Sequence, residues 1–349
     1  MDWTRPRSGR FRFWRVDAAT RLEVEQITTV RPGGSITLNA NTALKVSGRL
    51  PVAAPIDIGD DLVRIYYEAV DADGDSDSIA LATVYAEADV TSYTSAAATS
   101  DLTLYSVLLA LQDAQIRETL TIVAGSVAVD EAADICEEAG LPVVASASTR
   151  ELQSDASWDP GTSLLEIVNY LMDVAGFWSV SVDGWGRVVM EPYTDPASRT
   201  AVWSFTDGDD SVFLPSVDVS TGAFRVPNVY VLVCSRPDDE PLVGSYTNDD
   251  PASPYSTVVR GREITVTDTV DDAVDTDDLD ARAKMRLLAA TADNETTTIR
   301  HAYAPLTIRD VCAFRWSAHD LSLRGAVQSQ EIALVPSAMT TTTVKRVGA

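Results

Sequence analysis

The sequence predicts a mainly β protein of the α+β class, in which antiparallel strands dominate and a small α/β segment interrupts them. Three observations support this fold class. Short β-prone runs separated by Gly, Pro and Asp turns fill the first hundred residues. A helix followed directly by a β-hairpin is expected in residues 163–193, and β-prone runs resume at Thr200. These patterns predict antiparallel sandwiches or barrels with one α/β insertion.

The N-terminal residues mix basic and aromatic side chains, which could form an edge strand or a nucleic-acid contact. We favour an edge strand, because Phe11, Phe13 and Arg15 fall on one face at the period of a strand. Further β-prone runs follow at residues 22–30, 35–50, 61–70 and 78–90. Residues 1–100 are therefore the first predicted β domain, completed by about residues 195–225.

Residues 101–194 are predicted to form the α/β insertion. Its first helix is expected after a cap at Ser100 or Asp101, and a second short helix should end at Gly140. The first helix is indicated by apolar and amide side chains at helical spacing, namely Leu102, Tyr105, Leu108, Leu109 and Gln112.

A capped helix and a hairpin complete the insertion. Ser163 and Glu166 have the spacing of a capping box, in which each side chain accepts from a backbone N–H at the helix start. Apolar residues then recur at helical period, and Gly176 suits a left-handed C-cap. Asp183-Gly184 lies between two β-prone runs, which predicts a tight hairpin turn.

Residues 226–336 form the second predicted β domain. A helix is expected at residues 276–291, where acidic residues occupy the first turn and suit the helix dipole. Strands are expected on both sides of this helix, and residues 237–254 should be an exposed connection. Residues 337–349 are predicted to be a loose C-terminal tail.

Several segments resemble the baseplate-hub, or tail-tip, proteins of tailed bacteriophages. The helix and hairpin read LLEIVNYLMDVAGFWSVSVDGWGRVVMEPY, and the N-terminal β segments read FRFWRVDAATRLEVEQITTV, NTALKVSGRL and IDIGDDLVRIYYEA. The C-terminal order is PNVYVLV, ARAKMRLLAA, a PL…DV strand and SQEIAL. The family commonly has Gly before the Asp of the PL…DV strand, whereas this chain has Arg309-Asp310.

The resemblance implies a non-enzymatic structural protein of the virion tail tip, assembled in the host cytoplasm. It implies two tube-type antiparallel β-barrel domains per subunit and a homotrimer whose barrels form a ring continuing the tail tube. The implied partners are a distal tail protein, a spike or fibre-bearing protein and the tape-measure protein. DNA would meet the protein only in transit through the ring, and no cofactor is expected.

The net charge of −25 excludes ordinary electrostatic binding of nucleic acid, because an acidic surface repels phosphates. The acidity alone indicates solubility, and in the ring implied by the resemblance it predicts an acidic lumen that repels passing DNA. Three widely spaced cysteines do not suggest a disulfide framework. The N-terminus lacks the apolar core of a signal peptide, and no apolar run predicts insertion into a membrane.

A weak calcium candidate lies in an acidic loop around Gly74. Its carboxylates alternate along the chain as hard cations require, but the EF-hand spacing fails because Ala82 stands where the last ligand would be. The candidate ligands are Asp71, Asp73, Asp75 and Asp77. We favour a solvated hairpin tip, and the alternative function is a calcium-dependent surface β-rich binding module.

No catalytic residue is predicted, since the chain contains no nucleophile, phosphate-loop or zinc-protease motif. A carboxylate-based glycosidase is a third function class, and the aromatic residues Phe177, Trp178 and Trp185 could stack a sugar. We favour turn positions for the carboxylates and hairpin packing for the aromatic rings. The carboxylates concerned are Asp207, Asp209, Asp210, Asp238, Asp239 and Asp249.

Overall fold

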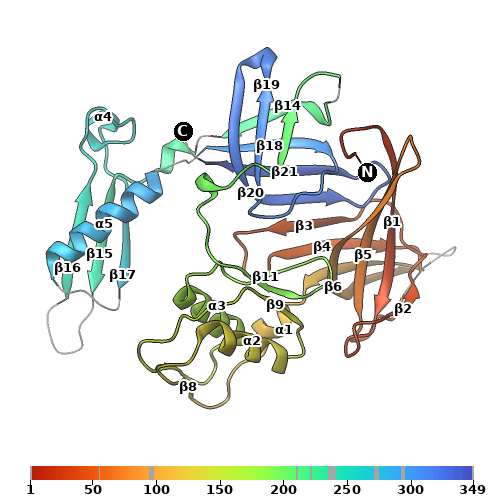
Figure 1. The fold of residues 1–349 in the computed structure, drawn as a ribbon, viewed down its shortest axis with the longest axis horizontal. Coiled ribbons are helices and arrows are strands. Elements are labelled where there is room, and N and C mark those ends of the chain that lie inside the picture. Colours follow the sequence, from red (N-terminus) through yellow and green to blue (C-terminus); the bar gives the residue numbers. More distant parts are fainter. Residues whose placement is uncertain are drawn as a thin grey trace.

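The computed structural model describes residues 2–54, 56–93, 98–209, 211–220, 222–234, 241–270, 275–291 and 295–347. A large β-sheet region forms the body of the molecule, an α/β layer lies below it in Figure 1, and a third unit stands at the left. The mainly β fold class is confirmed, and most of the strand pairs are antiparallel. The division into two tube-type barrel domains stays a prediction.

One thirteen-stranded sheet joins the two ends of the chain. Its N-terminal strands are β1 (Arg7–Val16), β2 (Glu23–Gln26), β3 (Ser35–Asn39), β4 (Val46–Val52), β5 (Leu62–Asp71), β6 (Ser76–Tyr93) and β7 (Ala98–Ser106). Its C-terminal strands are β13 (Trp203–Thr206), β14 (Phe213–Ser220), β18 (Thr296–Ala302), β19 (Val311–Trp316), β20 (Leu321–Ala333) and β21 (Met339–Arg346). The two sets meet where β20 pairs with β3, antiparallel and in register from Ser329 opposite Asn39 to Ala333 opposite Ser35.

The α/β layer consists of α1 (Leu109–Asp113), β8 (Leu120–Ile122), α2 (Ala128–Glu138), β9 (Val143–Ala145), β10 (Ala156–Trp158), α3 (Leu164–Ala175), β11 (Ser181–Val182) and β12 (Val188–Met190). Helix α3 buries a broad apolar face, and its core is continuous with Val16 of β1 and Leu62 of β5. This shared core fixes the layer to the sheet, because apolar surface is removed from water on both sides.

The Ser163 cap, the Gly176 helix end and the turn at Asp183 are confirmed, whereas no hydrogen bond from a backbone N–H to the Glu166 side chain completes the capping box in the described residues. The Ser163 hydroxyl accepts from the Glu166 N–H at 3.2 Å, and Gly176 closes α3 with a left-handed φ of 71°. Strands β11 and β12 pair on either side of the turn at Asp183, whose carboxylate accepts from the N–H groups of Trp185 and Arg187.

The third unit is a three-stranded sheet covered by one long helix. It contains β15 (Val229–Cys234), β16 (Leu242–Thr247), β17 (Thr265–Val270), α4 (Thr257–Arg260) and α5 (Thr276–Thr291), and short 3-10 turns elsewhere are η1 (Pro196–Ser198), η2 (Ala223–Arg225) and η3 (Ser317–His319). Leu279, Ala283 and Leu287 lie one turn apart on α5 and are buried against β15. Gly244 permits this close packing, since a Cβ there would lie 2.3 Å from the Cβ of Leu279.

Three expectations are wrong, and one of them concerns residues 237–254, where Leu242–Thr247 form strand β16 rather than part of an exposed connection. The helix expected from residue 101 is instead strand β7 up to Ser106, and α1 begins only at Leu109. Leu102 and Leu104 are both fully buried because they alternate on a strand paired with β4 on one side and β6 on the other.

The expected loose tail is also wrong between Met339 and Arg346. These residues form β21, which pairs with β18 and with β20. Thr340, Thr342 and Val344 are fully buried at the period of a strand. The Thr-rich run is therefore an internal strand, as its β-branched side chains favour. No helix in the described ranges is long and apolar enough to cross a membrane.

His301 lies fully buried in β18 and joins a polar network in the C-terminal part of the sheet. Its Nδ1 contacts the Ala302 carbonyl at 2.7 Å and therefore carries the proton, so that Nε2 accepts from the Thr342 hydroxyl at 2.8 Å. Its ring lies 4.6 Å from that of Phe205. Burial lowers the pKa of His301 to about 4.

The buried His301 predicts a loss of stability in acid. The unfolded chain takes up a proton near pH 6.5 and the folded chain only near pH 4, so stability is complete above the upper value and falls as the pH drops through this window. The loss should reach about 3 kcal/mol. Denaturant unfolding of the wild type and of His301→Gln at several pH values measures it. The His301→Gln curve should be flatter, and equal slopes in the two proteins would contradict the prediction.

Candidate functional site: a junction pocket around Arg309

The tip of the β11–β12 hairpin rests on the N-terminal strands of the large sheet. The Thr83 hydroxyl donates to the Gly184 carbonyl at 2.9 Å. A Cβ on Gly184 would lie 1.8 Å from the Ala80 carbonyl oxygen, so a glycine is required for this contact. Buried Arg64 places its guanidinium 5.0 Å from the centre of the Trp185 ring.

The start of the same hairpin segment rests on the C-terminal part of the chain. The Arg309 guanidinium donates to the Ser179 carbonyl at 2.8 Å and lies 4.9 Å from the centre of the Trp178 ring. Trp178 contacts Tyr193, with 4.5 Å between the ring centres. The Arg309 side chain therefore fixes the α/β layer to the sheet at a second point.

A cavity of about 690 Å³ opens beside this contact, and we call it the junction pocket. Its walls come from residues 40–41, 178–179, 195–197, 326–328 and 345–347, together with Tyr193 and Arg309. These segments are far apart in the sequence and belong to both halves of the large sheet, the α/β layer and the connection after it.

Arg309 adopts a backbone conformation that favours glycine. Its φ is 72°, and its N–H donates to the Val327 carbonyl at 2.7 Å. A non-glycine residue in the left-handed region costs about 1–2 kcal/mol. This geometry would suit the glycine that the resemblance to phage hub proteins leads us to expect at this position. Here the arginine side chain offsets the cost by its contacts with Trp178 and Ser179.

The junction pocket concentrates positive charge in an acidic protein. Arg309, Lys345 and Arg346 line it, and Lys45 lies nearby with its ammonium donating to the Ala40 carbonyl at 2.7 Å. Burial, with a smaller effect of Arg309, lowers the pKa of Lys45 to about 8. Arg346 pairs with Glu295 at 2.9 Å.

The other pocket cations lack such neutralisation. Within the described ranges neither Arg309 nor Lys45 pairs with a carboxylate, and the Lys345 ammonium has no hydrogen-bond or ion-pair partner. Asp195 also lines the pocket, but its carboxylate accepts from the Ala197 N–H and so caps a local turn. The pocket is therefore suited to an anionic group.

The calcium candidate is the turn between β5 and β6. The Asp71 carboxylate accepts from the N–H groups of Asp73 and Asp75 at 3.0 and 2.9 Å, which shapes the turn. Asp73 pairs with Arg5, and Asp77 accepts from the Ser78 N–H. The described residues include no group of three or more His, Cys, Asp or Glu side chains that could hold a metal ion. The calcium site stays a prediction.

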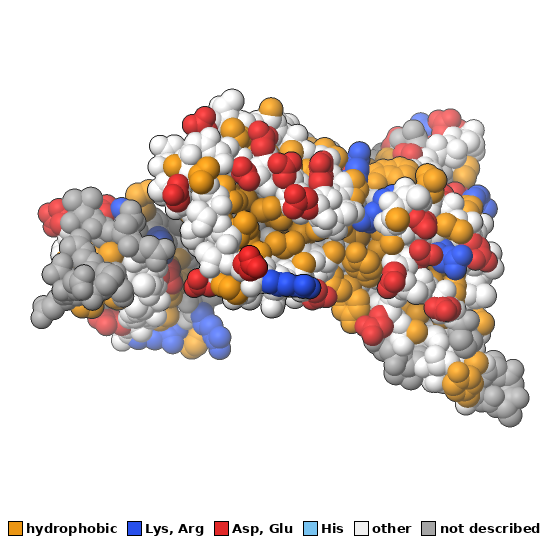
Figure 2. Space-filling model, turned by 90° about the horizontal axis from the view of Figure 1, so that it is seen from below, with side chains coloured by type: hydrophobic (Ala, Val, Ile, Leu, Met, Phe, Trp, Pro, Cys, Tyr) orange, Lys and Arg blue, Asp and Glu red, His pale blue; other side chains and the backbone are white. Residues whose placement is uncertain are grey.

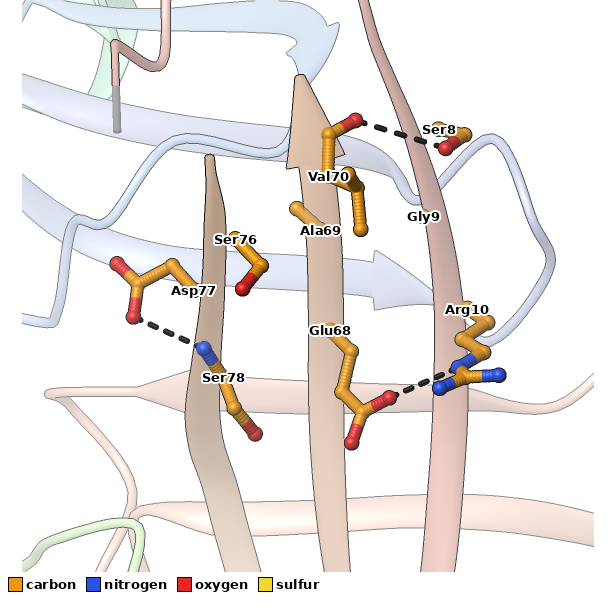
Figure 3. Close-up of a pocket in the computed structure, with 9 residues that line it drawn as sticks. All are labelled: Ser8, Gly9, Arg10, Glu68, Ala69, Val70, Ser76, Asp77 and Ser78. Carbon is orange, nitrogen blue, oxygen red and sulfur yellow. Dashed lines mark hydrogen bonds and ion pairs between the residues drawn. The ribbon is translucent and has the colours of Figure 1, made fainter. Parts of the chain in front are cut away.

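A polar groove of about 770 Å³ lies beside this turn, across β1, β5 and β6. Figure 3 shows Arg10 on β1 reaching Glu68 on β5, with 2.8 Å between Nε and the carboxylate. Arg12 pairs with the same carboxylate at 2.9 Å. The charges of this groove neutralise one another, in contrast to those of the junction pocket.

Of the carboxylates considered for catalysis, the structure describes Asp207, Asp209 and Asp249, and Asp207 and Asp249 belong to different parts of the fold. Asp207 accepts from the N–H and hydroxyl of Ser317 and so fastens a turn, whereas Asp249 follows β16 in the third unit. Asp210, Asp238 and Asp239 lie outside the described residues.

The three aromatic residues considered for sugar stacking do not form one platform either. Trp178 lines the junction pocket, Trp185 lies at the hairpin tip against β5, and Phe177 packs on the core of the α/β layer. Sequence reasoning missed the junction pocket, and its one visible signal was Arg309 at a position where glycine is common.

Comparison with solved structures identifies proteins that share this architecture. No family model matches the chain, and no curated protein matches it in sequence. A tail protein from Neisseria meningitidis superposes with a TM-score of 0.69 at 12% identity, covering 97% of each chain. The chain has the fold of phage tail proteins. The sequence resemblance to that family is thus confirmed at the level of the fold.

Two prophage proteins agree with this tail-protein fold. The 43 kDa tail protein of prophage MuSo2 from Shewanella oneidensis gives a TM-score of 0.66 at 13% identity, over 96% of this chain and 98% of that one. The prophage tail protein gp18 from Listeria monocytogenes gives 0.51 at 12% identity, over 96% and 94%. Each likeness extends over almost the whole of both chains.

Substitution of Arg309 should separate backbone strain from side-chain contact. Arg309→Ala should lower the free energy of unfolding by about 1–3 kcal/mol, because the contacts with Ser179 and Trp178 are lost. Arg309→Gly loses the same contacts but relieves the left-handed strain, so it should be about 1 kcal/mol more stable than the Ala variant. Denaturant unfolding of the three proteins measures both differences. Equal stability of the Ala and Gly variants would contradict the assigned strain.

Proposed function

We propose that this protein is a structural component of a phage tail, forming a trimeric baseplate hub at the tail tip. The observation that carries the proposal is the likeness of fold to three phage tail proteins, which extends over 94–98% of their chains. The likeness therefore involves the whole architecture and not one part of it. A structural role is favoured over an enzymatic one because these similar structures are tail proteins.

In this proposal three copies form a ring that continues the tail tube. The ring would bind a distal tail protein on one side and a spike or fibre-bearing protein on the other, with the tape-measure protein as a further partner. The protein would be assembled in the host cytoplasm and reside in the virion. Closed rotational symmetry is the usual arrangement of such homo-oligomers.

The net charge of −25 supports a role around DNA in transit. Figure 2 views the molecule from below and shows acidic side chains spread over that surface, with basic ones fewer and gathered in several places. An acidic lumen would repel the phosphate backbone and keep passing DNA from binding.

The proposal predicts that the protein is found at the tip of assembled tails. Virions should contain the chain, and antibody labelling under negative stain should mark the end of the tail opposite the capsid. Averaged images of the tip should show a three-fold ring with a central hole, lined by a net acidic surface. Absence of the chain from purified virions would overturn the structural proposal. A basic lumen would overturn only the electrostatic part.

A further inference from the structure

We infer that the junction pocket receives the acidic helix α2 (Ala128–Glu138) of a second copy of this chain. The inference rests on the proposed homotrimer and names the contact between its subunits. The pocket supplies cations on one copy, and α2 supplies carboxylates on the next.

The pocket side of this contact is a group of cations without sufficient counter-charge. The Arg309 guanidinium is buried against a carbonyl and an aromatic ring, and the charge of Glu191 acts on it only from beyond ion-pair distance. Lys345 adds an ammonium without a partner in the described part of the chain. Burying cations beside one another is costly unless an anion accompanies them. A carboxylate entering the cavity would supply that anion.

The helix side of the contact is a row of unpaired carboxylates. Its exposed acidic residues are Asp130, Asp134 one turn later, and Glu137 and Glu138 a further turn along α2. Within the described ranges none of them forms an ion pair.

Two of these carboxylates occupy an unfavourable position. Glu137 and Glu138 lie in the last turn of α2, which contains no basic residue, and negative charge there opposes the helix dipole. Arg21 donates to the Gly140 carbonyl just beyond the helix, but it does not pair with either glutamate. Cations from outside the subunit would therefore stabilise this end of α2.

A protein carboxylate fits the pocket better than a nucleic acid. The cavity is a half-open pocket with cations on part of its wall rather than a long basic stripe, and the protein as a whole repels phosphates. Trp178 and Tyr193 provide aromatic walls against which the apolar part of a glutamate can lie. The pocket contains no residue of α2, so the pocket of one copy can take the helix of the next. Such a head-to-tail contact closes into a ring when the rotation between copies closes, as it does in the proposed trimer, and otherwise gives an open filament.

A charge exchange between the two sides tests the contact. Sedimentation velocity of the full-length protein at low salt, over a range of concentrations, measures self-association of the wild type, Lys345→Glu, Asp134→Lys and the double variant. Each single variant should weaken association at least tenfold, and the double variant should recover most of the loss. Higher salt should weaken the wild-type association, because the contact is between charges.

Lys284→Glu on α5 is the matched control, since it makes the same change of charge on a helix outside the pocket. It should change association less than twofold, and circular dichroism and thermal unfolding show that each variant is folded. A wild type that stays monomeric throughout, or association that survives both single variants, overturns the inference. Either result leaves the tail proposal standing, because that proposal is tested on virions.

Discussion

The α/β layer is held to the large sheet at both ends of one short segment, and these contacts help to fix the layer relative to the N-terminal and C-terminal halves of the sheet. At one end the hairpin turn lies against β6, where Gly184 permits an approach that any Cβ would block and Thr83 donates to its carbonyl. At the other end Arg309 holds Trp178 and Ser179. The first contact involves the N-terminal strands and the second the C-terminal strands. The layer therefore bridges the two halves that β3 and β20 already join, and a shift of either half would strain both contacts.

Arg309 makes both favourable and unfavourable contributions to the free energy of folding. Its left-handed φ costs about as much as a good hydrogen bond contributes, and its burial carries a desolvation penalty that lowers the pKa of the guanidinium. The carbonyl of Ser179, the ring of Trp178 and the more distant charge of Glu191 offset these costs only partly, since none of them forms an ion pair with the guanidinium. A glycine would fold here with less strain but would leave the start of the hairpin segment unattached. The arginine thus has a strained backbone conformation, but its side chain makes a hydrogen bond to a residue 130 positions away in the sequence.

Features that depend on neighbouring residues could be predicted from the sequence, whereas features that depend on distant residues could not. Ser163, Gly176 and Asp183 each act within a few residues of chain, so the helix cap, the helix end and the hairpin turn follow from spacing alone. The segment around Leu102 was misread as a helix because its burial is decided by β4 and β6 on either side. The Thr-rich β21 was misread as a tail because its partners β18 and β20 are what make it a strand. The junction pocket was beyond reach, since it brings together residues from position 40 to position 347. Only Arg309, standing where glycine is common, marked its place.

The unpaired charges at the junction pocket and on α2 have a common explanation. A chain with 52 acidic and 27 basic residues would be expected to neutralise every buried cation, and many arginines do pair, as Arg10, Arg12 and Arg15 do with neighbouring carboxylates. At the junction pocket, two buried cations and a free ammonium are left without such partners in the described ranges, although carboxylates are abundant elsewhere on the same surface. The imbalance is local and is matched by an opposite one on α2. A subunit that leaves cations unpaired at one site and carboxylates unpaired at another is less stable alone than it would be with both satisfied. Association between copies can pair the cations of the pocket with the carboxylates of α2. This pairing is a physical reason to expect an ordered assembly, although the net charge makes separate copies repel one another at long range.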